Sequence, residues 1–255
     1  MRKLVGLLVG LVVLAVAGTA LAGQGATNSN GDFADLSVKV TPPISGTAKA
    51  PRGVGLTFGS FVGNRINANR TINPTTLTVR FNQNFTDNGL RFPGCTINPK
   101  VLSKCPAASK VGSGTAEGEL LSTTGGPPTY VPATLAVYNG KPFGSKAPTE
   151  IFIASVGGKP ATELDFSVTR VGRGLTFTQL QFPNAPSSGP TIYLTKFSVT
   201  TSDRTETRTI KGKKVKIHLL EAPTVCHGSW TFTQTFGYAH QAPLTATDSQ
   251  PCIKG

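Results

Sequence analysis

The chain has 255 residues, and 25 Lys and Arg against 12 Asp and Glu give it a formal net charge of +13 at pH 7. Its 29 Gly and 19 Pro exceed the share in an average globular protein but are too few for a low-complexity chain. Helical periodicity is missing after residue 22, and a strand–helix–strand rhythm is missing throughout, so we expect neither an α-helical bundle nor a doubly wound nucleotide-binding domain.

The N-terminus has the pattern of a secretory signal peptide. Arg2 and Lys3 precede an apolar run at residues 4–17, and the small residues of a cleavage site follow and end at Ala22. The run is short for a membrane-spanning helix. We therefore expect cleavage after Ala22, a secreted mature protein with no transmembrane segment, and a flexible leader at residues 23–34 because that stretch is polar and Gly-rich.

The remainder of the chain alternates apolar and polar residues, which is the period of a β-strand. Clusters of Gly, Pro, Asn and Ser separate the alternating segments. These segments lie at residues 35–40, 76–81, 133–140, 150–156, 163–171, 175–182, 191–199, 205–220, 229–236 and 244–248. They predict an all-β, turn-rich fold, an antiparallel β-sandwich of roughly a dozen strands. We expect residues 35–255 to form one domain, with two packed β halves as the alternative.

Four cysteines remain in the exported chain: Cys95, Cys105, Cys226 and Cys252. An even number in an oxidising compartment predicts two disulfides, for which three pairings are possible. Proximity in sequence favours Cys95–Cys105 and Cys226–Cys252. A hairpin centred near residues 239–240 would place Cys226 opposite Cys252, at a separation that a disulfide spans.

The segment CHGSWTFTQTFGYAH, residues 226–240, combines a cysteine with two histidines and several aromatic residues. A metal site or an activated nucleophile would need a thiolate beside His227, and we expect Cys226 to be in a disulfide. We expect His240 at the hairpin tip, too far from His227 to share an ion. Aromatic residues of one strand face could stack on a sugar but are more typical of a sandwich core. They are Trp230, Phe232, Phe236 and Tyr238.

Two pairs of carboxylates have i, i+2 spacing on a strand: Glu117 with Glu119, and Glu163 with Asp165. Glycoside hydrolysis uses two carboxyls about 5–10 Å apart, and this spacing is compatible with it. Because Leu164 should point inward, we expect Glu163 and Asp165 to face solvent as ordinary surface charges. The sequence has no Gly-x-Ser-x-Gly elbow, phosphate-binding loop or dinucleotide fingerprint. We therefore expect no catalytic residues, no cofactor and no metal site.

One segment concentrates the positive charge. Arg208, Lys211, Lys213, Lys214 and Lys216 lie within nine residues and form a possible contact for a polyanion, such as an anionic envelope polymer or a lipid surface. Nucleic-acid readers interleave aromatic with basic residues, and this segment has only aliphatic partners, so no specific nucleic acid is expected. We expect its histidine, His218, to lie on the solvated strand face.

Four segments in order carry a resemblance: FPGCT at 92–96, CPAASKVGSGTAEGEL at 105–120, VYNG at 137–140, and the stretch from Cys226 to Cys252. Together they resemble a group of secreted, two-disulfide, β-rich proteins of actinobacteria that have no established function. The resemblance implies export and a β-rich fold. It also implies a turn at His240, and it brings no catalytic residues.

These observations lead to one expectation for function and one alternative. We expect an exported, non-enzymatic β-sandwich that acts as a structural or binding module at or outside the cell envelope. The alternative is a secreted hydrolase or carbohydrate-active enzyme whose site is assembled from residues distant in the sequence.

Overall fold

The structure is a computed structural model, and it describes residues 25–28, 31–64, 74–120, 129–180, 192–239 and 241–255. The expected signal peptide at residues 1–22 and the expected tip residue His240 lie outside this part of the chain. Both therefore stay predictions. No helix in the described part is long and apolar enough to span a membrane.

The described residues form sixteen strands and two short 3-10 helices. In chain order these are β1 (Ala26–Thr27), β2 (Asp32–Thr41), β3 (Gly55–Asn64), β4 (Thr76–Phe81), β5 (Thr86–Asp87), η1 (Gly89–Arg91), η2 (Ala107–Ser109), β6 (Lys110–Leu120), β7 (Thr129–Gly140), β8 (Thr149–Val156), β9 (Lys159–Val171), β10 (Gly174–Gln179), β11 (Ile192–Thr201), β12 (Thr205–Ile210), β13 (Lys213–His218), β14 (Leu220–Glu221), β15 (Ser229–Gly237) and β16 (Leu244–Pro251).

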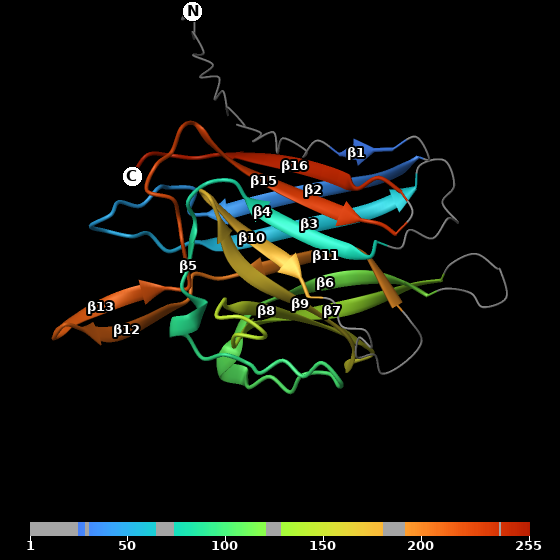
Figure 1. Ribbon diagram of the computed structural model, residues 1–255, viewed down its shortest axis with the longest axis horizontal. Helices are drawn as coiled ribbons and strands as arrows, with labels where there is room; N and C mark the ends of the chain where they lie inside the picture. The colour runs from blue at the N-terminus through green and yellow to red at the C-terminus, as the bar shows by residue number, and fades with distance from the viewer. Residues whose placement is uncertain (1–24, 29–30, 65–73, 121–128, 181–191, 240) are drawn as a thin grey trace, which may run out of the picture.

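Twelve strands form one antiparallel sheet in the order β1-β2-β3-β11-β6-β7-β8-β9-β10-β4-β15-β16. The sheet curls until β16, at one edge, lies beside β2, near the other edge (Figure 1). The two layers of the predicted sandwich are therefore two halves of one continuous sheet. The predicted all-β, antiparallel fold class is confirmed.

Side chains of β16 join the two edges where no strand ladder does. The Asp248 carboxylate accepts a hydrogen bond from the Val38 backbone N–H at 2.6 Å. The Gln250 amide bonds both backbone groups of Val40, accepting from the N–H and donating to the carbonyl oxygen. Because an unpaired backbone group inside a protein is costly, these side chains take the place of a ladder between β16 and β2. Beyond β16, backbone hydrogen bonds of Ile253 with Pro43 and Ser45 continue the seam.

The inner surface of the curled sheet carries the main core, a cluster that includes side chains of β2, β3, β4, β9, β10, β15 and β16. Trp230 and Phe232 on β15 are fully buried, and Phe236 is nearly so. Tyr238, just beyond β15, packs partly buried against the same core. The aromatic face of the C-terminal segment is thus a core face, as its period predicts.

Both predicted disulfides are confirmed. Cys95 and Cys105 are joined with their Cα atoms 4.9 Å apart, and Cys226 and Cys252 with theirs 5.9 Å apart. The register of β15 with β16 pairs Ser229 with Pro251, which centres the hairpin at residue 240. The second disulfide therefore closes the open end of this hairpin.

Residues 92–109, which we call the covering segment, lie against the outer face of β7, β8 and β9. The segment is tied to β7 by backbone hydrogen bonds of Cys95 with Asn139 and Lys141. Its Cys95 and Ile97 pack on Ile151 and Ile153 of β8 in a second, smaller core. This face of the sheet is therefore buried and not solvated.

Two sequence expectations about strands are corrected. Part of the expected flexible leader at 23–34 is in strands, since it contains β1 and the first residues of β2, where Asp32 is fully buried. The Gly-rich segments β3 and β6 were not among the predicted strands. A Cβ atom on Gly114 of β6 would collide with the Ser198 carbonyl of neighbouring β11. Glycine is needed here because the neighbouring backbone approaches closely.

Candidate ligand-binding cavity

A cavity lies between the two halves of the curled sheet, within the main core. Its volume is about 80 Å³, whereas a site for one water molecule needs about 10–15 Å³. The cavity thus exceeds a single-water void. Six phenylalanines supply most of its aromatic surface: Phe58, Phe81, Phe152, Phe166, Phe177 and Phe197.

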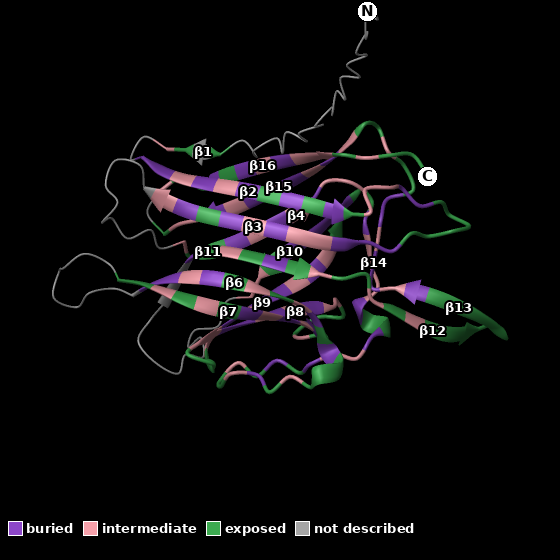
Figure 2. Cartoon of the chain, turned by 180° about the vertical axis from the view of Figure 1, so that it is seen from behind, coloured by how far each residue is buried: buried purple, intermediate pink, exposed green. Residues whose placement is uncertain are grey.

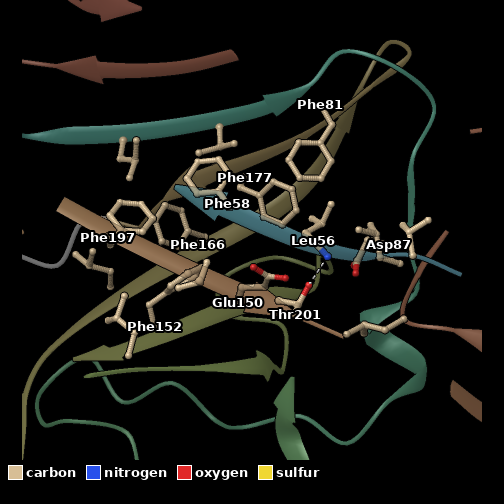
Figure 3. A pocket seen from close by; sticks show the side chains of 18 of the residues that line it. Leu56, Phe58, Phe81, Asp87, Glu150, Phe152, Phe166, Phe177, Phe197 and Thr201 are labelled. Carbon is tan, nitrogen blue, oxygen red and sulfur yellow. Dashed lines mark hydrogen bonds between the residues drawn. The ribbon is translucent and has the colours of Figure 1, made fainter. Parts of the chain in front are cut away.

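Strand alternation explains why these rings meet. On β9 the inward positions include Leu164 and Phe166, and on β8 they include Phe152, so both strands turn aromatic or aliphatic side chains to the cavity. The rings of Phe58 and Phe197, from strands β3 and β11, stack with centroids 5.7 Å apart. Segments distant in sequence therefore build one apolar wall, and Figure 3 shows the rings around the space.

Glu150 breaks the apolar pattern. It stands on β8 two residues before Phe152, on the same inward face, and its carboxyl points into the cavity (Figure 3). The structure shows no hydrogen-bond partner for this carboxyl among the residues it describes. Glu150 lies inside the molecule, yet water can still reach part of it because it borders the cavity. Burial, and then the charge of Asp87, raise the pKa of Glu150 to about 8.

Asp87 is the second acid of the cavity lining. Burial raises its pKa to about 6, against a lowering effect of the hydrogen bond it accepts from the Gly89 backbone N–H at 3.3 Å. Near neutral pH, Asp87 is therefore ionised while Glu150 keeps its proton. A protonated carboxyl can donate one hydrogen bond and accept others, so Glu150 can bond a polar group of a molecule in the cavity.

Glu163 and Asp165 correct a sequence expectation. They do point away from the main core, as the alternation on β9 predicts, but the covering segment buries them to 5% and 3% exposure. Glu163 accepts hydrogen bonds from the backbone N–H and the hydroxyl of Ser103, both at 2.6 Å. Burial and the neighbouring Glu163 raise the pKa of Asp165. Glu163 thus fastens the covering segment, and neither acid faces solvent.

Glu119 is buried as well, at 2% exposure. Glu117 on the same strand is partly buried, and neither residue lines the cavity. The described residues contain no group of three His, Cys, Asp or Glu arranged to hold a metal ion. All four cysteines are in disulfides, so Cys226 offers no thiolate to His227.

The predicted polyanion residues lie on the hairpin of β12 and β13. Lys211, Lys213, Lys214 and Lys216 are exposed. Arg208 differs, because its guanidinium bonds the Arg91 carbonyl oxygen and lies 3.3 Å from a Glu206 carboxylate oxygen.

The histidine of this hairpin corrects another expectation. His218 shares a strand face with Lys214 and Lys216, as the alternation predicts. It is not solvated, since its Nδ1 lies 2.8 Å from an Asp203 carboxylate oxygen and its side chain is 14% exposed. His218 therefore fixes the base of the hairpin to the chain that precedes β12.

One pattern in the sequence indicates that Glu150 is buried, although Glu150 was not among the predicted site residues. In EIFIASV, residues 150–156, Glu150 has the parity of Phe152, while Ile151 and Ile153 have the other. Both faces of β8 are thus apolar, and a strand buried on both faces leaves an acid at its start inside the protein. Asp87 gave no comparable signal, because it lies on the two-residue strand β5.

Comparison with known proteins adds no assignment. No protein-family model, no curated protein and no solved structure matches the chain. The resemblance to secreted actinobacterial proteins stays an expectation.

Proposed function

We propose that the protein is an exported, non-enzymatic binding protein that holds a small apolar molecule in the cavity of its curled sheet. The observation that carries this proposal is Glu150, an acid without a partner among the described residues, which points into a space lined by six phenylalanines. Binding sites for small molecules are mostly apolar and have a few polar groups that fix orientation. The cavity has this composition.

The ligand is defined by what the lining can satisfy. The aromatic walls favour an apolar body, and transfer of apolar surface from water contributes about 25 cal/mol per Å². The carboxyl of Glu150 favours one polar group, such as a hydroxyl, a carbonyl or an amine, at the end of the ligand near β8. A long carbohydrate does not fit this lining, because the lining offers few polar side chains for its hydroxyl groups. They are Asp87, Glu150, Thr201 and Ser202.

The alternative, a secreted hydrolase or carbohydrate-active enzyme with a site assembled from distant residues, gains no support from Glu163 and Asp165. These two acids lie under the covering segment, on the face of β9 opposite to the cavity.

The test compares a filled cavity with an unchanged one. Leu164→Trp places a large ring into the cavity from β9, whereas Val171→Trp adds the same ring at an exposed position of the same strand. The probe is N-phenyl-1-naphthylamine, an uncharged apolar dye, and its bound fraction is measured by equilibrium dialysis. We expect Leu164→Trp to bind the dye at least about tenfold more weakly than wild type, because the added ring occupies its space.

The control variant should bind the dye as wild type does. Circular dichroism of both variants shows whether the β-sheet is intact. Equal dye binding by folded Leu164→Trp and Val171→Trp, or none by the wild-type protein, would contradict the proposal.

A further inference from the structure

The hairpin of β12 and β13 extends away from the curled sheet (Figures 1 and 2). Its turn has positive φ at Lys211 (49°) and Gly212 (77°), the backbone of a tight two-residue hairpin turn. We call residues 210–215, Ile-Lys-Gly-Lys-Lys-Val, the tip. The tip has two apolar side chains, those of Ile210 and Val215, and each is 39% exposed.

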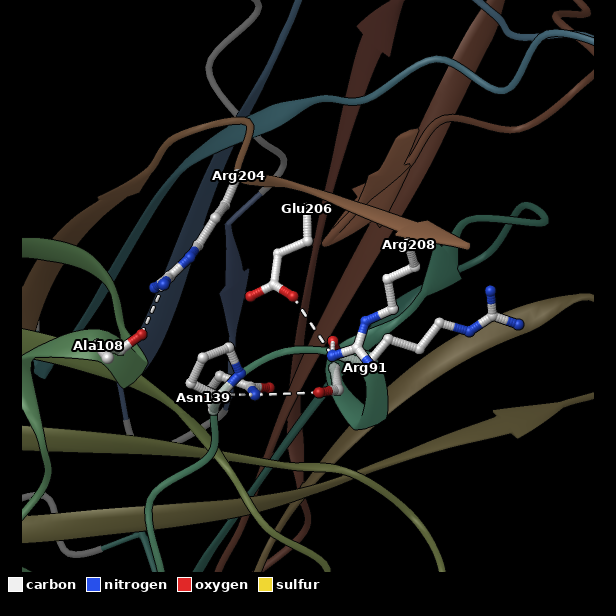
Figure 4. A network of polar contacts seen from close by, with 8 residues as sticks. Arg91, Ala108, Asn139, Arg204, Glu206 and Arg208 are labelled. Atoms are coloured by element: carbon white, nitrogen blue, oxygen red, sulfur yellow. Dashed lines mark hydrogen bonds and ion pairs between the residues drawn. The ribbon is translucent and has the colours of Figure 1, made fainter. Parts of the chain in front are cut away.

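The base of the hairpin is fixed to the body. Arg204 donates hydrogen bonds to the carbonyl oxygens of Lys110 at 2.8 Å and Ala108 at 2.6 Å. Arg208 bonds the Arg91 carbonyl oxygen on η1. Figure 4 shows Arg204 beside Ala108, and Arg208 beside Arg91 and Glu206. A hairpin held at its base keeps its tip in one orientation relative to the sheet.

The tip combines charge with apolar surface. Lys211, Lys213 and Lys214 lie there, and the described structure gives none of them a hydrogen bond or ion pair. The register places Ile210 opposite Lys213, so Ile210, Lys213 and Val215 share one face of the hairpin. Together with Arg208 and Lys216, the lysines of the tip give the hairpin five cationic side chains, whereas Glu206 is its one acidic residue.

We propose that this tip docks the protein on an anionic lipid bilayer surface. Each Lys or Arg near such a surface strengthens binding through the negative potential of the head groups. A dissolved polyanion would engage the lysines alone and leave Ile210 and Val215 in water. A bilayer takes up both, because aliphatic side chains enter the boundary between head groups and acyl chains while the lysines stay among the phosphates.

The base of the hairpin, and not its tip, borders the cavity. The chain that enters the hairpin supplies Thr201 and Ser202 to the cavity lining, and the chain that leaves it supplies Leu219 and Leu220. The six residues of β12 lead from this base to the tip, which is about 20 Å of strand. Docking by the tip therefore does not depend on the proposed function of the cavity.

The experiment measures co-sedimentation of the mature protein with two kinds of vesicle, phosphatidylcholine alone and phosphatidylcholine with phosphatidylglycerol. We expect binding to the anionic vesicles, and weakening of that binding by salt. Lys213→Glu combined with Lys214→Glu should lower binding at least about tenfold. The control, Lys100→Glu combined with Lys159→Glu, makes the same charge change at exposed positions outside the hairpin and should lower it much less.

A second variant separates a bilayer from a soluble polyanion. Ile210→Ser combined with Val215→Ser keeps every charge, and we expect it to weaken vesicle binding several-fold while its elution from a heparin column is unchanged. If this variant binds the vesicles as wild type does, the partner is an anionic polymer and the proposal is wrong. Absent binding to anionic vesicles would overturn it as well. Dye binding by the same proteins reports on the cavity independently.

Discussion

Glu150 is an acidic residue among the mostly apolar side chains that line the cavity. An acid whose pKa is raised on folding holds its proton more tightly in the folded chain than in the unfolded chain. The contribution of Glu150 to the free energy of unfolding is therefore fully present below pH 4.5, the ordinary pKa of a glutamate. It falls as the pH rises and is fully lost above the raised pKa of about 8. Asp87 acts in the same direction between 3.8 and about 6.

Glu150→Gln removes this loss, because an amide does not ionise. We expect the variant to be more stable than wild type at about pH 8.5, by on the order of 3 kcal/mol, with the difference shrinking towards about pH 4. Urea unfolding across this pH range, with disulfides intact, measures it. The matched control is Glu117→Gln on β6, outside the cavity. If the stability gap between Glu150→Gln and wild type does not change with pH, Glu150 is not a buried acid.

Residue positions show what alternation can and cannot predict. The period of two placed Glu163 and Asp165 correctly on the face of β9 opposite to Phe166. It could not show that the covering segment buries that face, because the segment has no period and reaches β9 through contacts such as that of Ser103 with Glu163. Sequence patterns assign faces of strands, whereas burial depends on what packs against each face.

The covering segment is the element that Glu163 holds. Ser103→Ala removes the hydroxyl that donates to Glu163 and accepts from the Asn98 backbone N–H. We expect the segment to open more often, since a hydrogen bond to a buried carboxyl contributes about 1–3 kcal/mol. Limited digestion with trypsin measures this, because Lys100 and Lys104 lie in the segment and are exposed.

Cleavage at these lysines should be several-fold faster in Ser103→Ala than in wild type. Ser145→Ala, in the loop between β7 and β8, is the control and should be cut at the wild-type rate. Binding of the apolar dye should be kept in both, because the segment lies on the opposite face of β9 from the cavity. Equal cleavage rates for all three proteins would show that Ser103 does not hold the segment.

At the level of elements, the sequence predicted strands whose side chains alternate and missed those rich in glycine. β15 and β4 match their predicted segments closely, since both carry β-branched and aromatic residues at period two. β6 lacks this pattern and glycines interrupt it in β3, yet both strands pair with β11. At Gly114 the neighbouring backbone leaves no room for a Cβ atom, and that requirement becomes visible only once the neighbours are known.

For the whole molecule, the cavity depends on strand order, which the local pattern does not contain. β11 inserts between β3 and β6, far from both in sequence, and thereby brings Phe197 against Phe58. The predicted sandwich had the correct inward faces but two separate layers. One curled sheet surrounds the space instead, and the strands that supply most of its lining are β3, β4 and β7 to β11. The seam between β16 and β2 joins the edges of this sheet without lining the cavity.

This seam gives the last prediction. Asp248→Ala combined with Gln250→Ala leaves the backbone groups of Val38 and Val40 without their partners. We expect a loss of at least about 2 kcal/mol in the free energy of unfolding, measured by urea titration. Two uncovered strand edges also invite pairing with other chains, so light scattering should detect larger species than for wild type. Thr247→Ala, at the residue directly before Asp248 on β16, should change neither; a double variant that behaves like it would show that the sheet closes without these side chains.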